Sequence, residues 1–262
     1  MLKGLIRQIA VVVTTVSVLI MNALANSLPL NGLTTGEISA RFPVLFTPAG
    51  YVFSIWSVIY IGLIAYTVYQ ALPAQRDSDL LDTVGWLYVA SGVLNIIWLL
   101  LWHYLQIALT FPVMALLLVT LIAIYARLGV GIRDVPAAEK WAVHIPFSVY
   151  LGWITVATVT NAAVVLYNAG WNGLGISAEI WTAVLIVAAT LIALGIAFTR
   201  GDAAYVLVPV WAFIGIAAAR SGSPLIVTTA YSAAAVLGVI ALIALVPRGP
   251  LPLIRQRSAT GG

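Results

Sequence analysis

Long, uninterrupted apolar runs constrain the fold of this chain more than any other feature. Eight of them are long enough to cross a bilayer as a helix, which takes about 17–25 mostly apolar residues. Only 8% of the 262 residues are charged, whereas a soluble domain carries roughly 25%. Transmembrane β-barrels are excluded because their strands alternate apolar and polar residues over about ten positions. The sequence therefore predicts an all-α integral membrane protein with about eight transmembrane helices, at residues 9–25, 51–72, 84–102, 105–128, 141–167, 180–198, 203–219 and 224–246.

The distribution of basic residues predicts how these helices are oriented. Lysine and arginine in short loops favour the cytoplasmic side. Of the 12 Lys and Arg residues, only Arg41 and Arg220 fall on the side opposite the N-terminus. We therefore expect a multi-pass protein of the cell membrane with cytoplasmic N- and C-termini. The start of the chain has two interpretations, a retained first helix or a cleavable signal peptide, because a basic segment and an apolar run precede Ala23-Leu24-Ala25.

Ionisable and metal-binding residues are scarce in the apolar runs. The chain has no cysteine, and its two histidines, His103 and His144, fall near the ends of predicted helices. Ion pumps and proton-coupled transporters usually carry ionisable residues at membrane depth, and none lies near the middle of any run. We expect no metal site, no covalent cofactor, no catalytic residue and no nucleic-acid partner. A protein without catalytic activity is favoured, and an enzyme stays an open alternative.

Nine tryptophans divide by their depth in the predicted helices. One group lies near the helix ends, where indoles anchor at the membrane interface. Its members are Trp86, Trp102, Trp141, Trp171 and Trp181. The other group lies deeper and must find partners for its indole N–H groups away from water, so we expect it to face the bundle interior. Its members are Trp56, Trp98, Trp153 and Trp211.

Helical spacing groups the deeper tryptophans with other aromatic and amide side chains. Residues at i, i+3 and i+7 share one face of a helix, and three predicted helices carry such a stripe. The stripes are Phe53, Trp56 and Tyr60; Asn95, Trp98 and Trp102; and Tyr150, Trp153, Ala157 and Asn161. A single stripe is typical of a helix-packing face, since asparagine and small residues hold membrane helices together. Three stripes in one bundle favour a site for a flat, largely apolar ligand.

The longest connection, residues 26–50, joins the first two predicted helices. Connections longer than about 12–15 residues usually have a function of their own. Thr34-Thr35-Gly36-Glu37 has the spacing of a capping box, which predicts a short surface helix. The connection is either a lid over the mouth of the bundle or a plain linker.

Three segments of the chain resemble a known family. Residues 48–60 (PAGYVFSIWSVIY), 94–98 (LNIIW) and 150–161, which begin Tyr-Leu-Gly-Trp, are similar to signature segments of the tryptophan-rich sensory protein or translocator protein (TspO/MBR) family. They occur in the right order on the second, third and fifth helices of that five-helix fold. The resemblance covers residues 9 to about 168. It implies a TspO-like domain at 1–168, followed by three additional transmembrane helices at 169–246 and a cytoplasmic tail at 247–262.

The resemblance implies a tryptophan-lined cavity under the long connection. Family members bind porphyrins (heme or protoporphyrin) and, in some cases, sterols or benzodiazepine-type drugs. The matching cavity or core positions, which with Phe53 are the predicted ligand-binding residues, are Trp56, Tyr60, Asn95, Trp98, Tyr150, Trp153, Ala157 and Asn161. The chain departs from the family pattern in its missing Gly-Pro before Trp56, in Val149 where a proline is expected, and in a connection without tryptophan.

We therefore expect a sensory or regulatory protein of the lipid bilayer that binds a porphyrin-like or other flat hydrophobic small molecule. A transporter of such a molecule is one alternative, since Pro209 beside Trp211 should kink the seventh helix. A porphyrin-modifying enzyme is another. We expect helices six to eight to pack on the five-helix core in place of part of an oligomer interface, with a homo-oligomer as the alternative.

Overall fold

The computed structural model describes residues 2–27 and 30–245, and within these residues the chain is helical without any β-strand. The cytoplasmic tail predicted at 247–262 lies outside the described residues. Seven helical segments of this part are long and apolar enough to cross a membrane, and α9 is a shorter apolar helix. The helices are α1 (Leu2–Ser27), α2 (Thr35–Ala40), α3 (Ile55–Ala71), α4 (Asp79–His103), α5 (Ile107–Leu128), α6 (Ala137–Glu139), α7 (Ile145–Asn168), α8 (Ala178–Arg200), α9 (Ala203–Ala219) and α10 (Pro224–Leu245).

Each predicted span coincides with one of these helices, and the differences lie at the ends. The first helix begins at Leu2 rather than at residue 9, and α4 begins at Asp79, where the Ser78 hydroxyl accepts a hydrogen bond from the Leu81 N–H. The fifth span is continuous from Ala137 to Asn168. It contains a π-helical turn, Lys140–His144, which ends two residues before Pro146. Proline has no N–H to continue the regular ladder.

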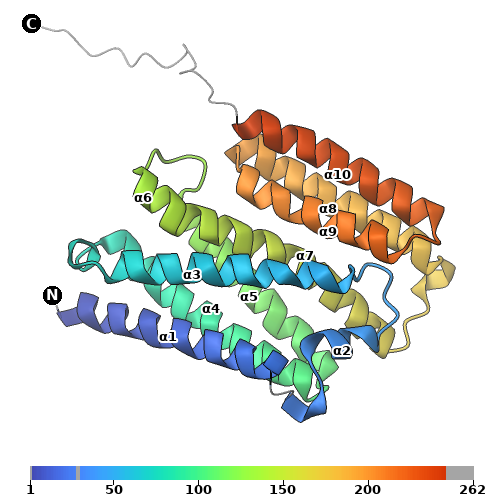
Figure 1. Ribbon diagram of the computed structural model, residues 1–262, viewed down its shortest axis with the longest axis horizontal. Coiled ribbons are helices and arrows are strands. Elements are labelled where there is room, and N and C mark those ends of the chain that lie inside the picture. The colour runs from blue at the N-terminus through green and yellow to red at the C-terminus, as the bar shows by residue number, and fades with distance from the viewer. Residues whose placement is uncertain (1, 28–29, 246–262) are drawn as a thin grey trace, which may run out of the picture.

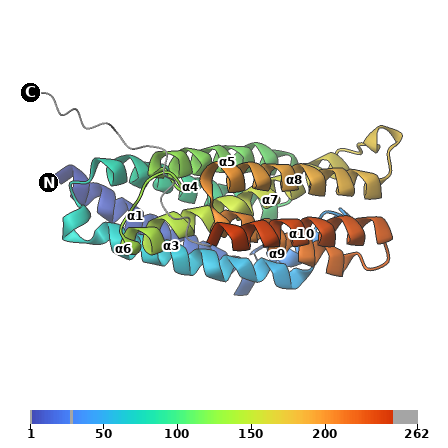
Figure 2. The ribbon, with the colours of Figure 1, turned by 90° about the horizontal axis from the view of Figure 1, so that it is seen from above.

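Five helices close into a ring. Packing runs from α1 to α4, α5, α7 and α3 and back to α1. The remaining long helices, α8, α9 and α10, pack against one another, and α9 joins them to the ring through α7. Figures 1 and 2 show these two groups side by side, with the long helices lying roughly along the long axis of the molecule. Side chains on one face each of α3, α4 and α7 can therefore share the interior of the ring.

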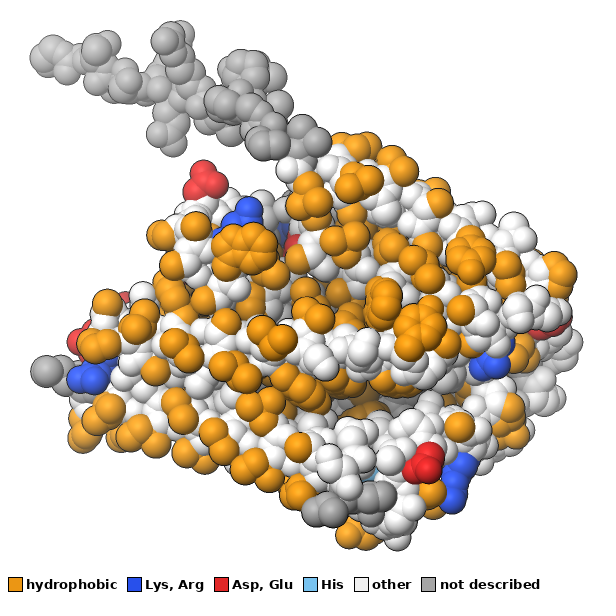
Figure 3. Space-filling model, in the orientation of Figure 1, with side chains coloured by type: hydrophobic (Ala, Val, Ile, Leu, Met, Phe, Trp, Pro, Cys, Tyr) orange, Lys and Arg blue, Asp and Glu red, His pale blue; other side chains and the backbone are white. Residues whose placement is uncertain are grey.

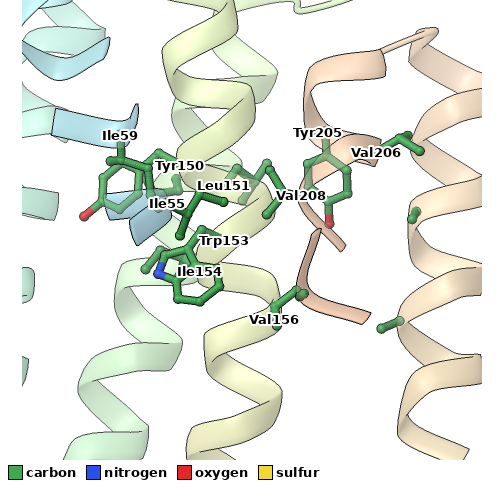
Figure 4. Packing of buried hydrophobic residues seen from close by; sticks show 14 of the residues in the cluster. Ile55, Ile59, Tyr150, Leu151, Trp153, Ile154, Val156, Tyr205, Val206 and Val208 are labelled. Atoms are coloured by element: carbon green, nitrogen blue, oxygen red, sulfur yellow. The ribbon is translucent and has the colours of Figure 1, made fainter. Parts of the chain in front are cut away.

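Gly152 allows α9 to approach α7 closely. A Cβ atom at this position would lie 3.0 Å from the Val208 Cβ and 3.1 Å from the Tyr205 carbonyl oxygen. Small residues at such crossings let membrane helices pack at short distance. In Figure 4, Leu151 of α7 points toward Val208 of α9, whereas Tyr150 and Trp153 point toward the ring interior. The seam with α9 and the stripe of α7 are thus different faces of one helix.

Charged and apolar side chains are separated on the surface. Figure 3 shows apolar side chains along the flank of the molecule and the charged ones at its ends. Arg7, near the start of α1, is a buried exception and donates hydrogen bonds to the carbonyl oxygens of Gln75 (2.8 Å) and Ser78 (3.3 Å). Asp202, at the start of α9, is another. This distribution is the one that a bilayer requires around the middle of a helix bundle.

Candidate functional site

We call residues 30–50 the lid. Its helix α2 begins with the predicted capping box: the Glu37 N–H donates to the Thr34 hydroxyl, and the Thr34 N–H donates to the Glu37 carboxylate at 2.7 Å. Hydrogen bonds from the Thr34 N–H and hydroxyl lower the pKa of Glu37 below its ordinary value. The Thr34 side chain thereby fixes the start of α2, and α2 contributes Thr35 and Ser39 to the site.

The lid is tied to the end of α4. The Trp102 indole N–H donates to the Thr35 carbonyl oxygen at 3.3 Å, the Asn31 amide donates to the His103 carbonyl oxygen at 3.0 Å, and the Thr35 hydroxyl lies 3.1 Å from the His103 Nε2. The prediction of Trp102 as an interface anchor is wrong. Its side chain is 5% exposed and stacks on Trp98 with 5.4 Å between ring centroids, because position i+4 places it on the same face of α4.

The lid is also tied to α9. Arg220 donates from Nε to the Leu45 carbonyl oxygen (3.1 Å) and from a terminal nitrogen to the Val44 carbonyl oxygen (3.0 Å), and the Ala49 N–H donates to the Gly215 carbonyl oxygen (3.0 Å). Both parts of the molecule outside the lid, the ring and the C-terminal helices, therefore hold it in place. A free linker has no such bonds, so the structure favours a lid.

Trp211 of α9 differs from its prediction. We expected its ring to face the interior, but the side chain is 37% exposed. Its N–H does have a partner, the Val52 carbonyl oxygen at 3.1 Å, and its ring meets Tyr51 edge-on. A single hydrogen bond to the backbone at the surface of the helix bundle satisfies the indole N–H, so the Trp211 side chain does not have to be buried.

The first hollow under the lid, which we call the indole pocket, lies between α2, α4 and α7. Its volume is about 60 Å³, and its walls are almost entirely apolar. The aromatic lining residues are Phe53, Trp98, Trp102 and Trp153. Ala157 and Asn161 of α7 complete the wall on the side of the third predicted stripe. The space holds one ring or a small substituent, not a whole ligand.

Trp153 has an unsatisfied hydrogen-bond donor. Its side chain is 3% exposed, and its indole N–H has no partner among the described residues. The ring is held edge-on by Phe53, at a centroid distance of 5.9 Å, and by Trp56, at 6.4 Å. Buried donors are nearly always paired, and an unpaired one costs about 1–3 kcal/mol. The Trp153 side chain lines the indole pocket, and its N–H is left without an acceptor from the described residues.

Asn161 fixes the orientation of Trp98. The Trp98 indole N–H donates to the Asn161 side-chain oxygen at 3.4 Å, and the Asn161 amide donates to the Thr110 hydroxyl of α5 at 2.8 Å. Asn161 is 3% exposed. The chain of bonds from α4 through α7 to α5 therefore sets the plane of the indole that separates the two hollows of the site.

The second hollow, which we call the lid pocket, lies between α1, α3, α4 and the lid. Its volume is about 320 Å³, and Trp56, Tyr60, Asn22 and Asn26 line it. Trp56 and Tyr60 stack with 5.5 Å between ring centroids. The surface is visibly hollowed between α3 and α2 in Figure 3. The two pockets share Thr35, Phe53 and Trp98 as lining residues, so they adjoin.

The structure places the nine predicted ligand residues in two classes. All except Asn95 and Tyr150 line one or both pockets. Asn95 is buried and accepts a hydrogen bond from the Asn22 amide at 3.1 Å, and Tyr150 is buried edge-on against Trp56. These two residues pack behind the wall. The single cavity that we expected for Trp56, Trp98 and Trp153 is divided, because the rings of Phe53 and Trp98 stand between its halves.

The prediction missed Asn22 and Asn26 of α1 and Thr35 and Ser39 of α2. The spacing of the two asparagines, i and i+4 on one face, was a signal in the sequence that could have found them. The threonine and serine reach the site only because the lid folds back over the ring. No local pattern predicts that arrangement.

The other four tryptophans predicted as interface anchors fall into two kinds. Trp86 is 46% exposed and Trp141 is 68% exposed, and neither lines the pockets under the lid. Trp181 instead donates its N–H to the Gly173 carbonyl oxygen at 2.9 Å and packs against Trp171. Trp86 and Trp141 are therefore the suitable controls for substitutions in the site.

The two pockets under the lid are lined by neutral side chains. No Asp, Glu, Lys, Arg or His lines either pocket under the lid. Within residues 2–27 and 30–245, no group of three or more His, Asp or Glu side chains could hold a metal ion. What remains is a set of flat rings, amides and hydroxyls around a mainly apolar space.

Comparison with known proteins gives one match. The family model described as TSPO-like protein matches residues 8–243. The match continues past residue 168, where the resemblance of the signature segments ends, and includes α8, α9 and most of α10. No curated protein and no solved structure matches the chain.

Proposed function

Because the chain belongs to the TSPO-like protein family, we propose that this multi-pass membrane protein binds a flat, mainly apolar small molecule beneath its lid and acts as a sensory or regulatory protein. The lid pocket accommodates the body of the ligand, and the indole pocket accepts one ring or substituent. A porphyrin is the ligand that the family resemblance implies. The volume of the lid pocket, about 320 Å³, falls within the range of about 300–1,000 Å³ for small-molecule sites.

The buried N–H of Trp153 is the observation that carries this proposal. Of the buried polar atoms without a partner among the described residues, the Trp153 nitrogen is the one whose side chain lines a pocket under the lid. A ligand with a carbonyl or ring nitrogen acceptor would satisfy it. The indole faces of Trp56 and Trp98 offer stacking, which contributes about 0.5–1.5 kcal/mol per aromatic pair beyond area burial.

The charge of the lining favours binding over coupled transport. Transporters driven by ions need charged or titratable groups beside the substrate, and both pockets are lined without any Asp, Glu, Lys, Arg or His. The lid is also held by hydrogen bonds from two sides. A held lid over a neutral site suits a receptor that retains its ligand.

Titration of the purified protein with protoporphyrin IX, followed by quenching of tryptophan fluorescence, tests the proposal. We expect saturable quenching by the wild type. Trp153→Phe keeps a ring but removes the N–H, so it should weaken binding about 2- to 12-fold, the equivalent of one hydrogen bond of about 0.5–1.5 kcal/mol. Trp86→Phe should leave the affinity unchanged. Absence of saturable quenching, or equal weakening by both variants, would refute the proposal.

We further infer that the protein lies in the cell membrane with cytoplasmic termini. The seven long helical segments and the shorter α9 together make an even number of passes, which brings Leu2 and Leu245 toward the same side of the bundle, as Figure 1 shows. Among the basic residues that the structure describes, only Arg41 and Arg220 belong to the lid end. A reporter fused to the C-terminus should be active only in its cytoplasmic form, and an externally active reporter would contradict the orientation.

A further inference from the structure

A third and larger hollow lies outside the ring. We call it the lateral pocket: it lies between α7, α8, the start of α5 and lid residues 43–46, and its volume is about 560 Å³. It shares no lining residue with the indole pocket or the lid pocket. Along α7, Ala157 and Asn161 line the indole pocket, whereas Ala162 and Leu166 line the lateral pocket. One helix therefore separates two distinct sites.

The packing of α8 leaves this space open. Although α8 follows α7 in the chain, it packs mainly against α9 and α10. The connection between α7 and α8 is held by Trp181, whose N–H donates to the Gly173 carbonyl oxygen at 2.9 Å and whose ring packs 5.2 Å from that of Trp171. Gly173 adopts a φ of +69°, which favours glycine. The packing of α8 on α9 and α10, and the contacts of Trp181 with Gly173 and Trp171, thus hold the residues around the hollow in place.

The lining has an apolar body and a polar rim. Phe111, Val159 and Leu185 belong to the body, and no lining residue is charged. At the rim, the Tyr167 hydroxyl and the Trp171 indole N–H make no hydrogen bond to other described residues. The Asn172 side-chain oxygen accepts a bond from the Leu174 N–H (3.0 Å), which leaves the amide N–H groups of Asn172 free to donate.

We propose that the lateral pocket binds one glycerolipid of the surrounding bilayer, with an acyl chain in the apolar body and an ester carbonyl at the rim. The body lies along the apolar lengths of α5, α7 and α8, at the depth of hydrocarbon, and the rim lies at their ends, where Trp and Tyr meet the interface. Neutral donors match an ester carbonyl oxygen. A phosphate group would call for Arg or Lys, which the lining lacks.

Native mass spectrometry of the purified full-length protein tests this inference. We expect one glycerolipid per wild-type chain to persist through detergent exchange. Ala162→Phe places a ring in the pocket and should lower the lipid-bound fraction at least fivefold, while Tyr167→Phe, which removes only the hydroxyl, should lower it about threefold. Ala235→Phe, on the exposed flank of α10, is the matched control and should retain the wild-type fraction.

A second measurement uses the wild type alone, so a folding defect in the Ala162 variant cannot decide the outcome. The protein is reconstituted with phosphatidylcholine that carries a photoreactive group in its acyl chain. Labelling should concentrate at least fivefold on residues 158–167 and 178–185 relative to the flank of α10. Equal lipid loss from the Ala162 and Ala235 variants, uniform labelling, or a retained molecule without an acyl ester would overturn the proposal.

Discussion

Replacement of Arg220 by methionine should release the lid while the helix bundle stays folded. The guanidinium donates to the carbonyl oxygens of Leu45 and Val44 at 3.1 and 3.0 Å. The Thr47 carbonyl oxygen lies 3.5 Å from a terminal guanidinium nitrogen, at the limit of hydrogen-bonding distance. Methionine keeps an apolar side chain of similar reach but has no donor. The substitution therefore removes the side-chain link between α9 and the lid, and it leaves the Ala49–Gly215 backbone bond and the bonds of the lid to α4 in place.

The size of the effect follows from these two short bonds. A hydrogen bond to a charged group contributes about 1.5–3 kcal/mol when buried. Arg220 is partly exposed, so water compensates part of the loss, and we take about 1.5–3 kcal/mol for both bonds together. At 1.4 kcal/mol per factor of ten, the open form of the lid should be populated about 10- to 150-fold more.

Hydrogen–deuterium exchange of the lid measures this population. The reporters are the Thr47 N–H, bonded to the Val44 carbonyl oxygen, and the Ala49 N–H, bonded to the Gly215 carbonyl oxygen. Both should exchange about 10- to 150-fold faster in the Arg220→Met variant. Arg41→Met is the control, because the exposed Arg41 side chain of the lid makes no hydrogen bond to the described residues. Unchanged exchange in the Arg220 variant, or equal acceleration in the control, would refute the reasoning.

Three further substitutions test other contacts. Gly152→Val should lower the thermal unfolding midpoint, since overpacking costs about 1–3 kcal/mol. Gly195→Ala should not lower it, because a Cβ atom at Gly195 would have no other atom within 4 Å. Equal midpoints of the two variants would contradict the tight contact between α7 and α9. Tyr125→Phe removes the hydrogen bond to the Asp202 carboxylate at 2.9 Å and should lower the free energy of unfolding by about 1.5–3 kcal/mol. Tyr231→Phe, at an exposed position, should leave it unchanged, and denaturant unfolding measures both variants. Thr34→Ala should speed amide exchange in α2 about 2- to 30-fold, the equivalent of one N-cap. Because the folded-state pKa of Glu37 is lowered, its part of the cap is complete at neutral pH and disappears as the pH falls through that value, which an acid titration of the Thr34 amide resonance follows; an amide that does not titrate would refute the capping box.

The helices were predictable because their apolar runs are set by the thickness of a bilayer. The span 203–219 matches α9 residue for residue, and the capping box at Thr34 correctly located α2. The stripes of α3, α4 and α7 were predictable because helical periodicity decides which residues share a face. Trp153 could therefore be assigned to the interior from its position relative to Tyr150 and Asn161.

The remaining features depend on contacts between segments far apart in the chain. Trp102 satisfied two patterns at once, a helix-end anchor and a stripe with Trp98, and only the fold of the lid over α4 decides between them. Arg220 looked like a loop charge, yet it crosses to Val44 and Leu45. The division of the site by Phe53 and Trp98 depends on side-chain packing, which one helical period does not determine.

The indole N–H resonance of Trp153 gives the most direct test of a ligand site beneath the lid. The protein is labelled with ¹⁵N-tryptophan, and the signals of Trp153, Trp86 and Trp141 are assigned by replacing each with phenylalanine. On addition of protoporphyrin IX, the account predicts that the Trp153 signal shifts or broadens until binding is saturated, while those of the exposed Trp86 and Trp141 stay in place. A Trp153 signal that does not move at saturation, or that moves no more than the two exposed signals, would contradict it.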